Sequence, residues 1–388
     1  MSIYMNNAAT TWPKPSLVGQ RMLDFLTDSG ANIARGSASR RDLDTMDMVI
    51  TCRETLGRIL GGYENGDPRY VTFTTNVTES LNVVLKGFLR SGMTVVTTSM
   101  EHNAVIRPLR RLERQDINVV VLPCDRQGRL NPGDLRNFLD DQLVDMVVMA
   151  HASNVCGVVQ DLKTVSSLCV ERGVPLVVDT AQTAGVLNIS ASELGISALC
   201  WTGHKGLMGP QGIGGILWNP GFASRCESLI DGGTGSFSHE EVQPTSMPDA
   251  FESGTLNLPG IAGLLGALEW LEETGISSIN HRETALGNRL FQGLLAIPDV
   301  VLYGPESMSN RLPVFSLNIQ DVDNGILAQA LSEQGIETRP GLHCAPLAHR
   351  TLGSFPQGSL RLSIGYFTSE EDVDKVLSVF KDLILRGI

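Results

Sequence analysis

The sequence predicts an α/β protein in which a mainly parallel β-sheet is covered by helices and followed by a smaller α+β region. Short β-branched, apolar runs recur between residues 70 and 218, and most of them alternate with stretches of helical periodicity. Continuous apolar strands separated by helices are typical of a parallel sheet buried on both faces. The length of 388 residues is enough for about two domains.

Seven runs are the expected strands of the large sheet. They are residues 70–74, 94–98, 118–122, 145–150, 175–179, 198–202 and 214–218, and the clearest helical stretches between them are 79–90, 103–115 and 161–172. A segment rich in Gly, Ser and Pro follows at 231–254, and this composition predicts a long functional loop that covers a site.

The C-terminal third predicts the smaller α+β region. After Pro259 two helical stretches reach about Leu295, and strands are expected near 300–302 and 313–319, with a helix from Asn324. A last helix is expected over about 369–386, because its first turn is acidic and capped by Ser369. The sequence contains no internal repeat, heptad array or low-complexity tract.

Composition narrows the class of function. With 42% hydrophobic and 19% charged residues the chain is of the globular class, and 30 basic against 42 acidic side chains give a net charge of −12. This charge argues against a nucleic-acid partner and favours a small substrate or a protein partner. The apolar runs fall short of the roughly 20 residues that cross a bilayer, and residues 1–7 lack the pattern of a secretory signal. We therefore expect no membrane association and a cytoplasmic location.

The seven cysteines form neither a C-x-x-C pair nor an even set, so they predict neither a disulfide framework nor a zinc ribbon. Most are expected to be reduced and buried. A metal enzyme built on His102, His151, His204, His343 and Cys344 has no typical ligand spacing, although folding could still bring these residues together.

Four polar segments follow strands or open helices, and the carboxyl ends of parallel strands are where ligands bind. Residues 74–80 run from a strand into a helix whose free N–H groups could hold a phosphate, although an ordinary Thr N-cap is the favoured explanation of this segment alone. His102 follows the next strand and could stack on a planar ligand or move a proton. Asp179 closes a buried strand, where a lone carboxylate needs a cationic partner or serves as a helix cap.

The fourth segment is 201–206 with the glycine-rich run 209–215. Its glycines allow close approach of a ligand, and a desolvated Lys205 could form a Schiff base, whereas a solvated surface lysine is the plain alternative. The spacing fits neither of the common nucleotide-binding glycine motifs. Together, a phosphate cradle, a stacking imidazole, a strand-end Asp and this lysine are the parts that hold pyridoxal 5′-phosphate (PLP).

Nearly the whole chain resembles the class V aminotransferase-fold enzymes, and specifically the group II cysteine desulfurases and their selenocysteine lyase relatives. The matching stretches are YMNNAATT (4–11), TESLN (78–82), EH (101–102), HASNV (151–155), DTAQ (179–182), GHK (203–205), FESGT (251–255), RPGLHCA (339–345) and RLS (361–363). The resemblance implies the PLP-dependent transferase fold of type I. It also implies an N-terminal segment 1–14 near the active site, a large PLP-binding domain 15–255 and a small domain 256–388 that carries the cysteine loop.

The resemblance further implies a role for each matching residue. Lys205 carries the cofactor, Asp179 pairs with its ring nitrogen, His102 stacks on the ring and Gln182 bonds the ring oxygen. The phosphate contacts are implied for Val77, Thr78, Thr202 and His204, and for Thr255 of a neighbouring subunit in a homodimer. The substrate carboxylate is implied to meet Asn154 and Arg361, and Arg339 is expected to join these substrate-binding residues.

Cys344 distinguishes a desulfurase from an ordinary aminotransferase. It lies in a loop with Gly and Pro beside His343 and near Arg339, a setting that favours a reactive thiolate. By the resemblance, L-cysteine displaces Lys205, the freed amine removes the α-proton, and the Cys344 thiolate takes the sulfur. The products are alanine and a persulfide for a protein or thiol acceptor, and L-selenocysteine would release selenide.

Three departures from the group II pattern stand out. Leu342 and Pro346 replace a histidine and a glutamine around the cysteine, Trp201 replaces a smaller residue, and 206–208 lengthen the lysine loop by one residue. Two other readings remain open: another class V enzyme (transaminase, epimerase or β-lyase) with Cys344 as a bystander, and a non-catalytic sulfur-relay scaffold.

Overall fold

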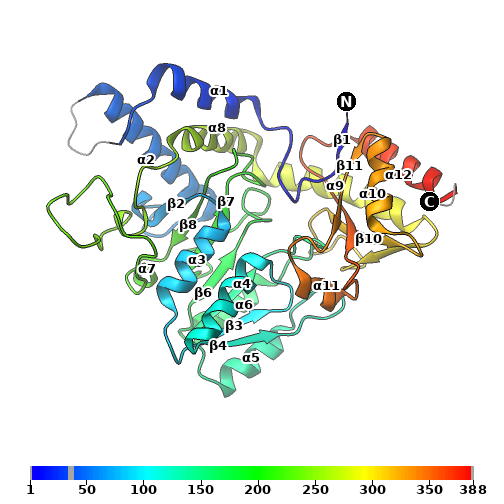
Figure 1. Cartoon of the computed structure of the whole chain (residues 1–388), viewed down its shortest axis with the longest axis horizontal. Helices are drawn as coiled ribbons and strands as arrows, with labels where there is room; N and C mark the ends of the chain where they lie inside the picture. Colours follow the sequence, from blue (N-terminus) through cyan, green and yellow to red (C-terminus); the bar gives the residue numbers. More distant parts are fainter. Residues whose placement is uncertain (1, 34–38, 386–388) are drawn as a thin grey trace.

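A seven-stranded sheet forms the larger part of the molecule in the computed structural model, which describes residues 2–33 and 39–385 (Figure 1). Its strand order is β2-β8-β7-β6-β5-β3-β4, and β8 alone runs antiparallel to its neighbours. The strands are β2 (Val71–Thr74), β3 (Thr94–Thr98), β4 (Asn118–Leu122), β5 (Met146–Ala150), β6 (Leu176–Asp179), β7 (Ala198–Thr202) and β8 (Gly214–Trp218). The prediction of a mainly parallel sheet with these seven strands is confirmed to within a residue at each end.

Helices cover both faces of this sheet, and each face has its own apolar core. One core includes residues of α2 (Arg40–Leu60), α5 (Pro132–Asp141), α6 (Leu162–Glu171) and α8 (Leu258–Thr274). The other includes residues of α3 (Val77–Phe88), α4 (Asn103–Leu112) and α7 (Pro220–Ala223). Helix α1 (Ser16–Asp24) packs along α8. Burial on both faces explains why β5, β6, β7 and β8 are continuously buried rather than alternating.

A four-stranded antiparallel sheet organises the C-terminal part, in the order β12-β13-β10-β9. These strands are β9 (Val300–Tyr303), β10 (Val314–Ile319), β12 (Arg339–Gly341) and β13 (Ser359–Ser363). They pack with α9 (Ile276–Leu295), α10 (Asn324–Glu333) and α12 (Glu370–Leu385) around a third core, and α11 (Pro346–Leu352) follows the cysteine loop. The expected helices and first two strands are present, and Arg386, the predicted end of the last helix, lies outside the described residues. The sequence did not predict β12 and β13.

Side-chain caps fix where two helices of the large sheet begin. The Asn76 side chain accepts a hydrogen bond from the Glu79 N–H, so α3 starts at Val77, two residues before the expected start. His102 caps α4 in the same way through its Nδ1, which accepts from the Ala104 N–H at 3.0 Å. Both helix N-termini therefore lie at the carboxyl ends of β2 and β3, as a parallel sheet requires.

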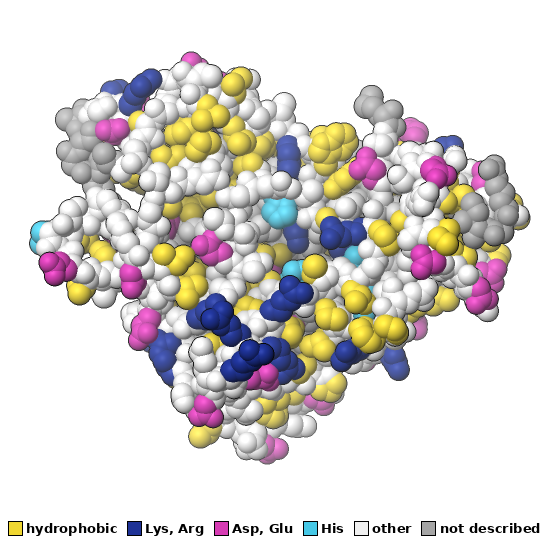
Figure 2. Space-filling model, in the orientation of Figure 1, with side chains coloured by type: hydrophobic (Ala, Val, Ile, Leu, Met, Phe, Trp, Pro, Cys, Tyr) yellow, Lys and Arg dark blue, Asp and Glu magenta, His cyan; other side chains and the backbone are white. Residues whose placement is uncertain are grey.

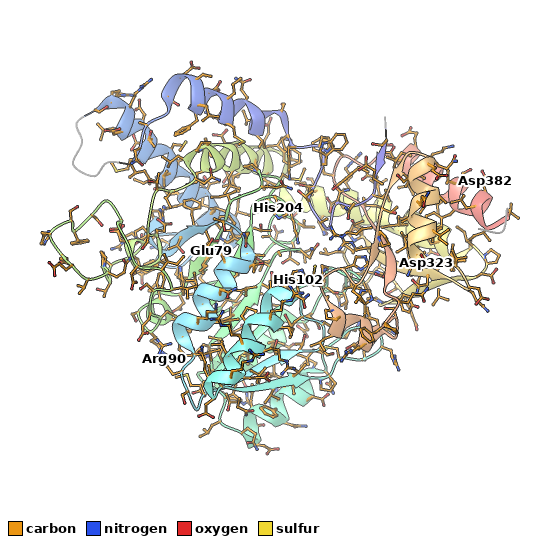
Figure 3. All side chains as sticks on the ribbon, viewed as in Figure 1. Glu79, Arg90, His102, His204, Asp323 and Asp382 are labelled. Carbon is orange, nitrogen blue, oxygen red and sulfur yellow. The ribbon has the colours of Figure 1, made fainter. Side chains whose placement is uncertain are left out.

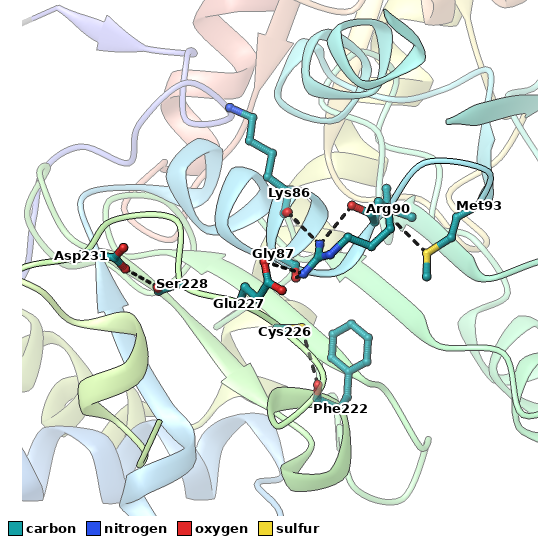
Figure 4. A network of polar contacts seen from close by, with 10 residues as sticks. Lys86, Gly87, Arg90, Met93, Phe222, Cys226, Glu227, Ser228 and Asp231 are labelled. Atoms are coloured by element: carbon teal, nitrogen blue, oxygen red, sulfur yellow. Dashed lines mark hydrogen bonds and ion pairs between the residues drawn. The ribbon is translucent and has the colours of Figure 1, made fainter. Parts of the chain in front are cut away.

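The segment 231–254 is a long loop, as predicted, with a single turn of 3₁₀-helix at Asp249–Phe251. The residues just before this loop are held to the end of α3. The Arg90 guanidinium pairs with Glu227 at 2.9 Å, and the Glu227 N–H donates to the Gly87 carbonyl (Figure 4). A side chain at Gly87 would meet the Glu227 carbonyl oxygen at 2.5 Å, so this approach needs glycine.

The far end of the loop is held by a buried ion pair. Glu252 accepts from the Arg53 guanidinium at 2.6 Å and from the Phe73 N–H at 2.6 Å, and both charged side chains are about 7% exposed or less. These bonds fix Glu252 to β2, so the following residues, including Thr255, leave the sheet at a defined place. Removing either partner of this pair would leave the other charge buried and unpaired, which strongly destabilises a protein.

The N-terminal segment reaches across both parts of the molecule. Strand β1 (Ile3–Tyr4) pairs in parallel with β11 (Ile336–Glu337), and Asn6 bridges to Ser363. Farther along, the Thr11 N–H donates to the His204 carbonyl. Within residues 2–33 and 39–385, no helix combines the length and the apolar character needed to cross a membrane.

Candidate active site

Most of the predicted cofactor-site residues lie at the carboxyl edge of the large sheet, beside the small C-terminal part. Asp179 ends β6, Thr202 ends β7 and His102 follows β3. Figure 3 shows His102 and His204 in the middle of the molecule, between the large sheet and the small one. The side chains that were selected from four separated segments therefore lie in one region.

Lys205 lies in the turn after β7, partly buried. Burial lowers the pKa of its ammonium group to about 8, while the negative charge of Asp179 acts in the opposite direction. An amine with this pKa has a substantial neutral fraction near neutral pH. Neutral amine is the form that attacks a carbonyl and accepts a proton, so Lys205 is suited to both tasks.

Asp179 is buried, at 5% exposure, and its Oδ1 accepts from the Ala181 N–H at 2.8 Å. Burial raises the pKa of this carboxyl, and Lys205 partly offsets the effect. A buried carboxylate is costly unless a cation faces it. Asp179 is therefore suited to a protonated ring nitrogen.

A second buried acid, Glu101, lies next to this region and was not singled out from the sequence. It accepts from the Thr98 hydroxyl at 2.6 Å and from the Ala150 N–H at 2.9 Å. Burial first, and then the charge of Asp179, raise the pKa of Glu101 to about 8. Glu101 is thus neutral at pH 7 and places no second negative charge beside Asp179.

We expect Glu101→Gln to remove a pH dependence of stability. The folded Glu101 keeps its proton up to about pH 8, whereas the unfolded residue loses it near 4.5, so wild-type stability falls as pH rises between these values. One proton corresponds to about 1.4 kcal/mol per pH unit. Urea unfolding at pH 5 and 7.5 should show the variant gaining about 3 kcal/mol relative to wild type between the two pH values.

The exposed Glu273→Gln is the matched control and should show no such gain. An equal pH profile for Glu101→Gln and wild type would mean that Glu101 is ionised in the folded protein.

His102 is held as a neutral imidazole of defined tautomer. Its Nδ1 accepts a hydrogen bond from the helix, so its single proton lies on Nε2. Burial and the positive charge of Lys205 lower the pKa of His102 to about 4. The ring therefore offers a neutral aromatic face and one N–H donor beside Lys205, which is what stacking on a planar ligand requires.

Two buried polar atoms near the end of β7 lack a hydrogen-bond partner in the described part of the chain. Thr202 Oγ1 and His204 Nδ1 are buried and make no hydrogen bond to any described residue. The first N–H groups of α3, at Val77 and Thr78, are those that a helix cannot satisfy internally. A side chain at Gly214 would meet the Asn76 backbone at 2.7 Å, so glycine lets β8 pass close behind this helix start. Unpartnered donors beside a helix N-terminus fit the phosphate of PLP.

Gln182 joins the site to the N-terminal segment, because its Nε2 donates to the Ala8 carbonyl at 3.0 Å. The next residues of that segment converge on the carbonyl of His204. Thr10 Oγ1 donates to it at 3.0 Å and Lys14 Nζ at 2.8 Å, in addition to the Thr11 N–H. The N-terminal segment thus fixes the peptide that precedes Lys205. The sequence predicted a segment near the site but gave Lys14 no role, and its only signal was proximity to the matching run 4–11.

Cys344 is exposed, whereas four of the seven cysteines are buried and two are half-buried, and none forms a disulfide. The expectation that most cysteines are buried and reduced agrees with this arrangement. The loop is tied to the site through its backbone: the Asn103 N–H, at the start of α4, donates to the Cys344 carbonyl at 2.7 Å. Asn154 Nδ2 donates to the His343 carbonyl at 2.8 Å.

Arg361 lies beside this loop in β13, buried at 3% exposure. It donates to the Asn154 carbonyl at 2.9 Å and to Asn6 Oδ1 at 3.0 Å, and its Nε has no partner among the described residues. Arg339 lies opposite Arg361 in β12, and burial together with this second positive charge lowers the pKa of Arg361 to about 10. Two adjacent guanidinium groups with free donors suit a carboxylate ligand.

Thr255 lies apart from the other predicted phosphate contacts. It is exposed and lines a surface cavity of about 630 Å³ together with Ile50, Arg53, Arg69 and the loop residues 233–235. Neither Lys205 nor His204 lines this cavity. Thr255 also lines a second cavity, with Thr74, Thr75 and Glu79 near the start of α3, and neither Lys205 nor His204 lines that one.

The described part of the chain contains no group of three or more His, Cys, Asp or Glu side chains placed to hold a metal ion. The five residues considered as ligands are spread between the cofactor region and the cysteine loop.

Positive side chains gather on the face that carries the site. Figure 2 shows Lys and Arg concentrated over α4. Its exposed side carries Arg107, Arg110 and Arg111, with Arg114 just beyond its end. In a chain with a net charge of −12, this local field attracts anions toward the helix that begins at His102.

Comparison with known proteins agrees with the motifs. The family model described as Aminotransferase class-V matches residues 3–376. A probable cysteine desulfurase of Pyrococcus abyssi is 30% identical over 98% of this chain and 94% of its own length. One of Methanothermobacter thermautotrophicus is 29% identical over 99% and 95%.

Among solved structures, the apo structure of a cysteine desulfurase from Thermococcus onnurineus NA1 superimposes with a TM-score of 0.92. It is 28% identical, and the alignment covers 100% of this chain and 95% of that one. The predicted fold and the resemblance stated from the motifs are both confirmed by these comparisons.

Proposed function

We propose, from the premise that this chain belongs to the aminotransferase class-V family, that it is a PLP-dependent cysteine desulfurase. It would convert L-cysteine to L-alanine and take the sulfur onto Cys344 as a persulfide. The family and the cysteine desulfurases within it depend on PLP. The observation that carries the proposal is the position of the exposed Cys344, whose loop is bonded to Asn103 at the start of α4, next to His102, and to Asn154.

The protein offers a partner for each part of PLP. We assign Lys205 to the aldehyde carbon, Asp179 to the ring nitrogen, His102 to the ring face and Gln182 to the ring oxygen. The unpartnered Thr202 and His204, with the N–H groups of Val77 and Thr78, would hold the phosphate. When bound, the cofactor supplies an electron sink for the substrate's α-carbon.

The chain's own residues perform the remaining steps. Arg361 and Asn154, with Arg339 at the edge, bind the substrate carboxylate and turn its side chain toward the cysteine loop. Lys205, as the neutral amine, removes the α-proton. The Cys344 thiolate then attacks the substrate sulfur. A sulfur–sulfur bond forms as the carbon–sulfur bond breaks, so the carbon is reduced and the sulfur is oxidised to the persulfide level.

We further propose that the enzyme works as a homodimer in which Thr255 reaches the phosphate of the neighbouring subunit. The support is that Thr255 is exposed and away from its own site, beside the 630 Å³ cavity. Exposed apolar residues border this region, including Ile50, Ile230 and Phe237, and such residues are typical of a covered surface.

The exposed persulfide would be passed to a thiol, and the arginines over α4 favour an acidic protein as its acceptor. L-Selenocysteine presents selenium in the place of sulfur and is the second candidate substrate. Free cysteines fit a reducing compartment, so we place the enzyme in the cytoplasm.

The deciding experiment measures alanine and sulfide from L-cysteine with the PLP-loaded protein and a reductant, with L-selenocysteine in parallel. Equal amounts of alanine and sulfide are expected. Pyruvate with ammonia would indicate a β-lyase, D-cysteine an epimerase, and loss of amino groups to a keto acid a transaminase. A protein that binds no PLP would instead be a scaffold.

A further inference from the structure

We propose that His349 and Ser354 form, with His343, a one-directional hydrogen-bond chain that holds Cys344 in the conformation in which it takes sulfur. His349 is then a positioning residue, since the hydrogen-bond partners of its side chain are His343 and Ser354. This inference rests on the proposed role of Cys344. It concerns α11 and the turn after it, to which the sequence analysis gave no function.

The three side chains lie in a buried row behind the cysteine loop. His343 Nε2 is 3.0 Å from the Arg339 carbonyl oxygen, and His343 Nδ1 is 3.2 Å from His349 Nε2. His349 Nδ1 is 2.7 Å from Ser354 Oγ. His349 is completely buried, and His343 and Ser354 are at most 6% exposed. Every ring nitrogen in the row therefore has a partner.

The donor and acceptor of each hydrogen bond in the row follow from the Arg339 carbonyl at its end, which can only accept. Burial lowers the pKa of His343 to about 3 and that of His349 to about 4, so both rings are neutral and each carries one proton. A carbonyl only accepts, so His343 Nε2 must donate to Arg339, and His343 Nδ1 must accept. His349 Nε2 then donates to His343, His349 Nδ1 accepts, and Ser354 Oγ donates to it.

The row acts on a strained part of the backbone. His343 and Cys344 both have positive φ, 48° and 55°, which costs a residue other than glycine roughly 1–2 kcal/mol. Cys344 is exposed, so packing does not hold it there. The His343 carbonyl is held by the Asn154 side-chain amide, and the Cys344 carbonyl is held by the Asn103 N–H. The His343 ring is the third attachment, and its orientation depends on His349.

The end of α11 brings Ser354 back to this row. Gly353 ends the helix with φ 88°, and the His349 carbonyl accepts from the N–H groups of Gly353 and Ser354 at 3.0 and 2.9 Å. This turn places the Ser354 hydroxyl against the ring of His349, five residues back along the chain. The backbone and the side chain of His349 therefore fix the same turn.

The consequence concerns where the thiol points. Held as described, Cys344 stays bonded to the start of α4, in the loop beside the guanidinium charges of Arg339 and Arg361. Without the row, the two strained residues relax toward negative φ and the thiol moves away from these charges. Both its reactivity and its transfer of sulfur should fall, while substrate binding by Arg361 and Asn154 should persist.

The test compares His349→Leu with His349→Gln in the PLP-loaded enzyme. Leu fills the space without a donor, whereas the Gln amide reaches the position of Nε2 and can donate to His343 Nδ1. The first readout is the rate at which iodoacetamide alkylates Cys344 without substrate, followed by mass spectrometry of its peptide. The second is the kcat and KM of alanine formation from L-cysteine.

We expect His349→Leu to slow alkylation at least about threefold and to lower kcat about tenfold, with KM changed less than twofold. His349→Gln should recover most of the alkylation rate and most of kcat. Ser354→Ala should act in the same direction as His349→Leu, and Ser354→Thr should behave as wild type. The matched control is Ser166→Ala in α6. It removes a buried hydroxyl that donates to the Leu194 carbonyl. It should alter neither readout.

Equal alkylation rates in wild type, His349→Leu and Ser354→Ala would overturn the proposal, as would equal losses in the Leu and Gln variants. The alkylation rates are measured without substrate. If the wild type makes no alanine, the proposed desulfurase function fails, and the alkylation comparison still decides whether His349 positions the cysteine.

Discussion

Cys344→Ala is expected to abolish alanine formation from L-cysteine while the protein keeps its cofactor. If Cys344 is the sulfur acceptor, its removal leaves no nucleophile for the substrate sulfur, and loss of a nucleophile from a catalytic unit lowers the rate on the order of 10³-fold or more. Because Cys344 is exposed and its side chain fills no core, the unfolding free energy should change by less than about 0.5 kcal/mol. Alanine is measured at matched PLP occupancy, under reducing conditions.

Cys226→Ala is the control, because this half-buried cysteine bonds the Phe222 carbonyl far from the site and should be dispensable. Equal alanine formation by wild type and Cys344→Ala would make Cys344 a bystander and favour another class V activity. A persulfide should also appear on the Cys344 peptide of the wild type after one turnover, as a mass increase of one sulfur atom.

Lys205→Ala is expected to prevent covalent attachment of PLP and to lower alanine formation on the order of 10²–10⁴-fold, the usual contribution of a positioned proton-transfer group. The physical reason is the lowered pKa of Lys205, about 8, which gives a neutral amine at the carboxyl edge of the sheet. Borohydride reduction followed by peptide mass analysis locates the attachment site. Activity is measured in parallel, as alanine from L-cysteine.

The control for this variant is Lys163→Ala, an exposed lysine of α6. PLP found on another lysine in the wild type, or unchanged activity in Lys205→Ala, would contradict the assignment. Lys14 is the informative alternative, because burial lowers its pKa to about 8 as well, but its Nζ is already bonded to Thr11 and to the His204 carbonyl.

Local pattern was enough to predict the large sheet. Runs such as 94–98 and 198–202 are apolar and β-branched throughout, and the structure buries them on both faces, so the sequence signal and the physical environment agree. Strands β12 and β13 were not predicted because they contain Arg339, Pro340 and Arg361, which local propensity disfavours. The two arginines are the residues proposed to bind the substrate carboxylate, and functional positions are where local propensity is expected to fail.

The sequence also predicted some residues of the candidate site and missed others. Residues that follow strands, such as His102, Asp179 and Lys205, could be selected because the edge of a parallel sheet gathers them. Asn6 and Lys14 were missed because their roles depend on contacts with Arg361 and His204 that lie 355 and 190 residues away along the chain. No local pattern encodes such a contact.

The pairing of β1 with β11 has a consequence for biosynthesis. Residues 3–4 are synthesised long before their partners, residues 336–337, and Asn6 is synthesised long before Arg361 and Ser363, which it contacts. At a synthesis rate of roughly 5–20 residues per second, this interval is on the order of tens of seconds. Until residues 336–363 have been synthesised, the N-terminal segment lacks its contacts with the small C-terminal part, so a nascent chain cannot complete the site before this part has been translated.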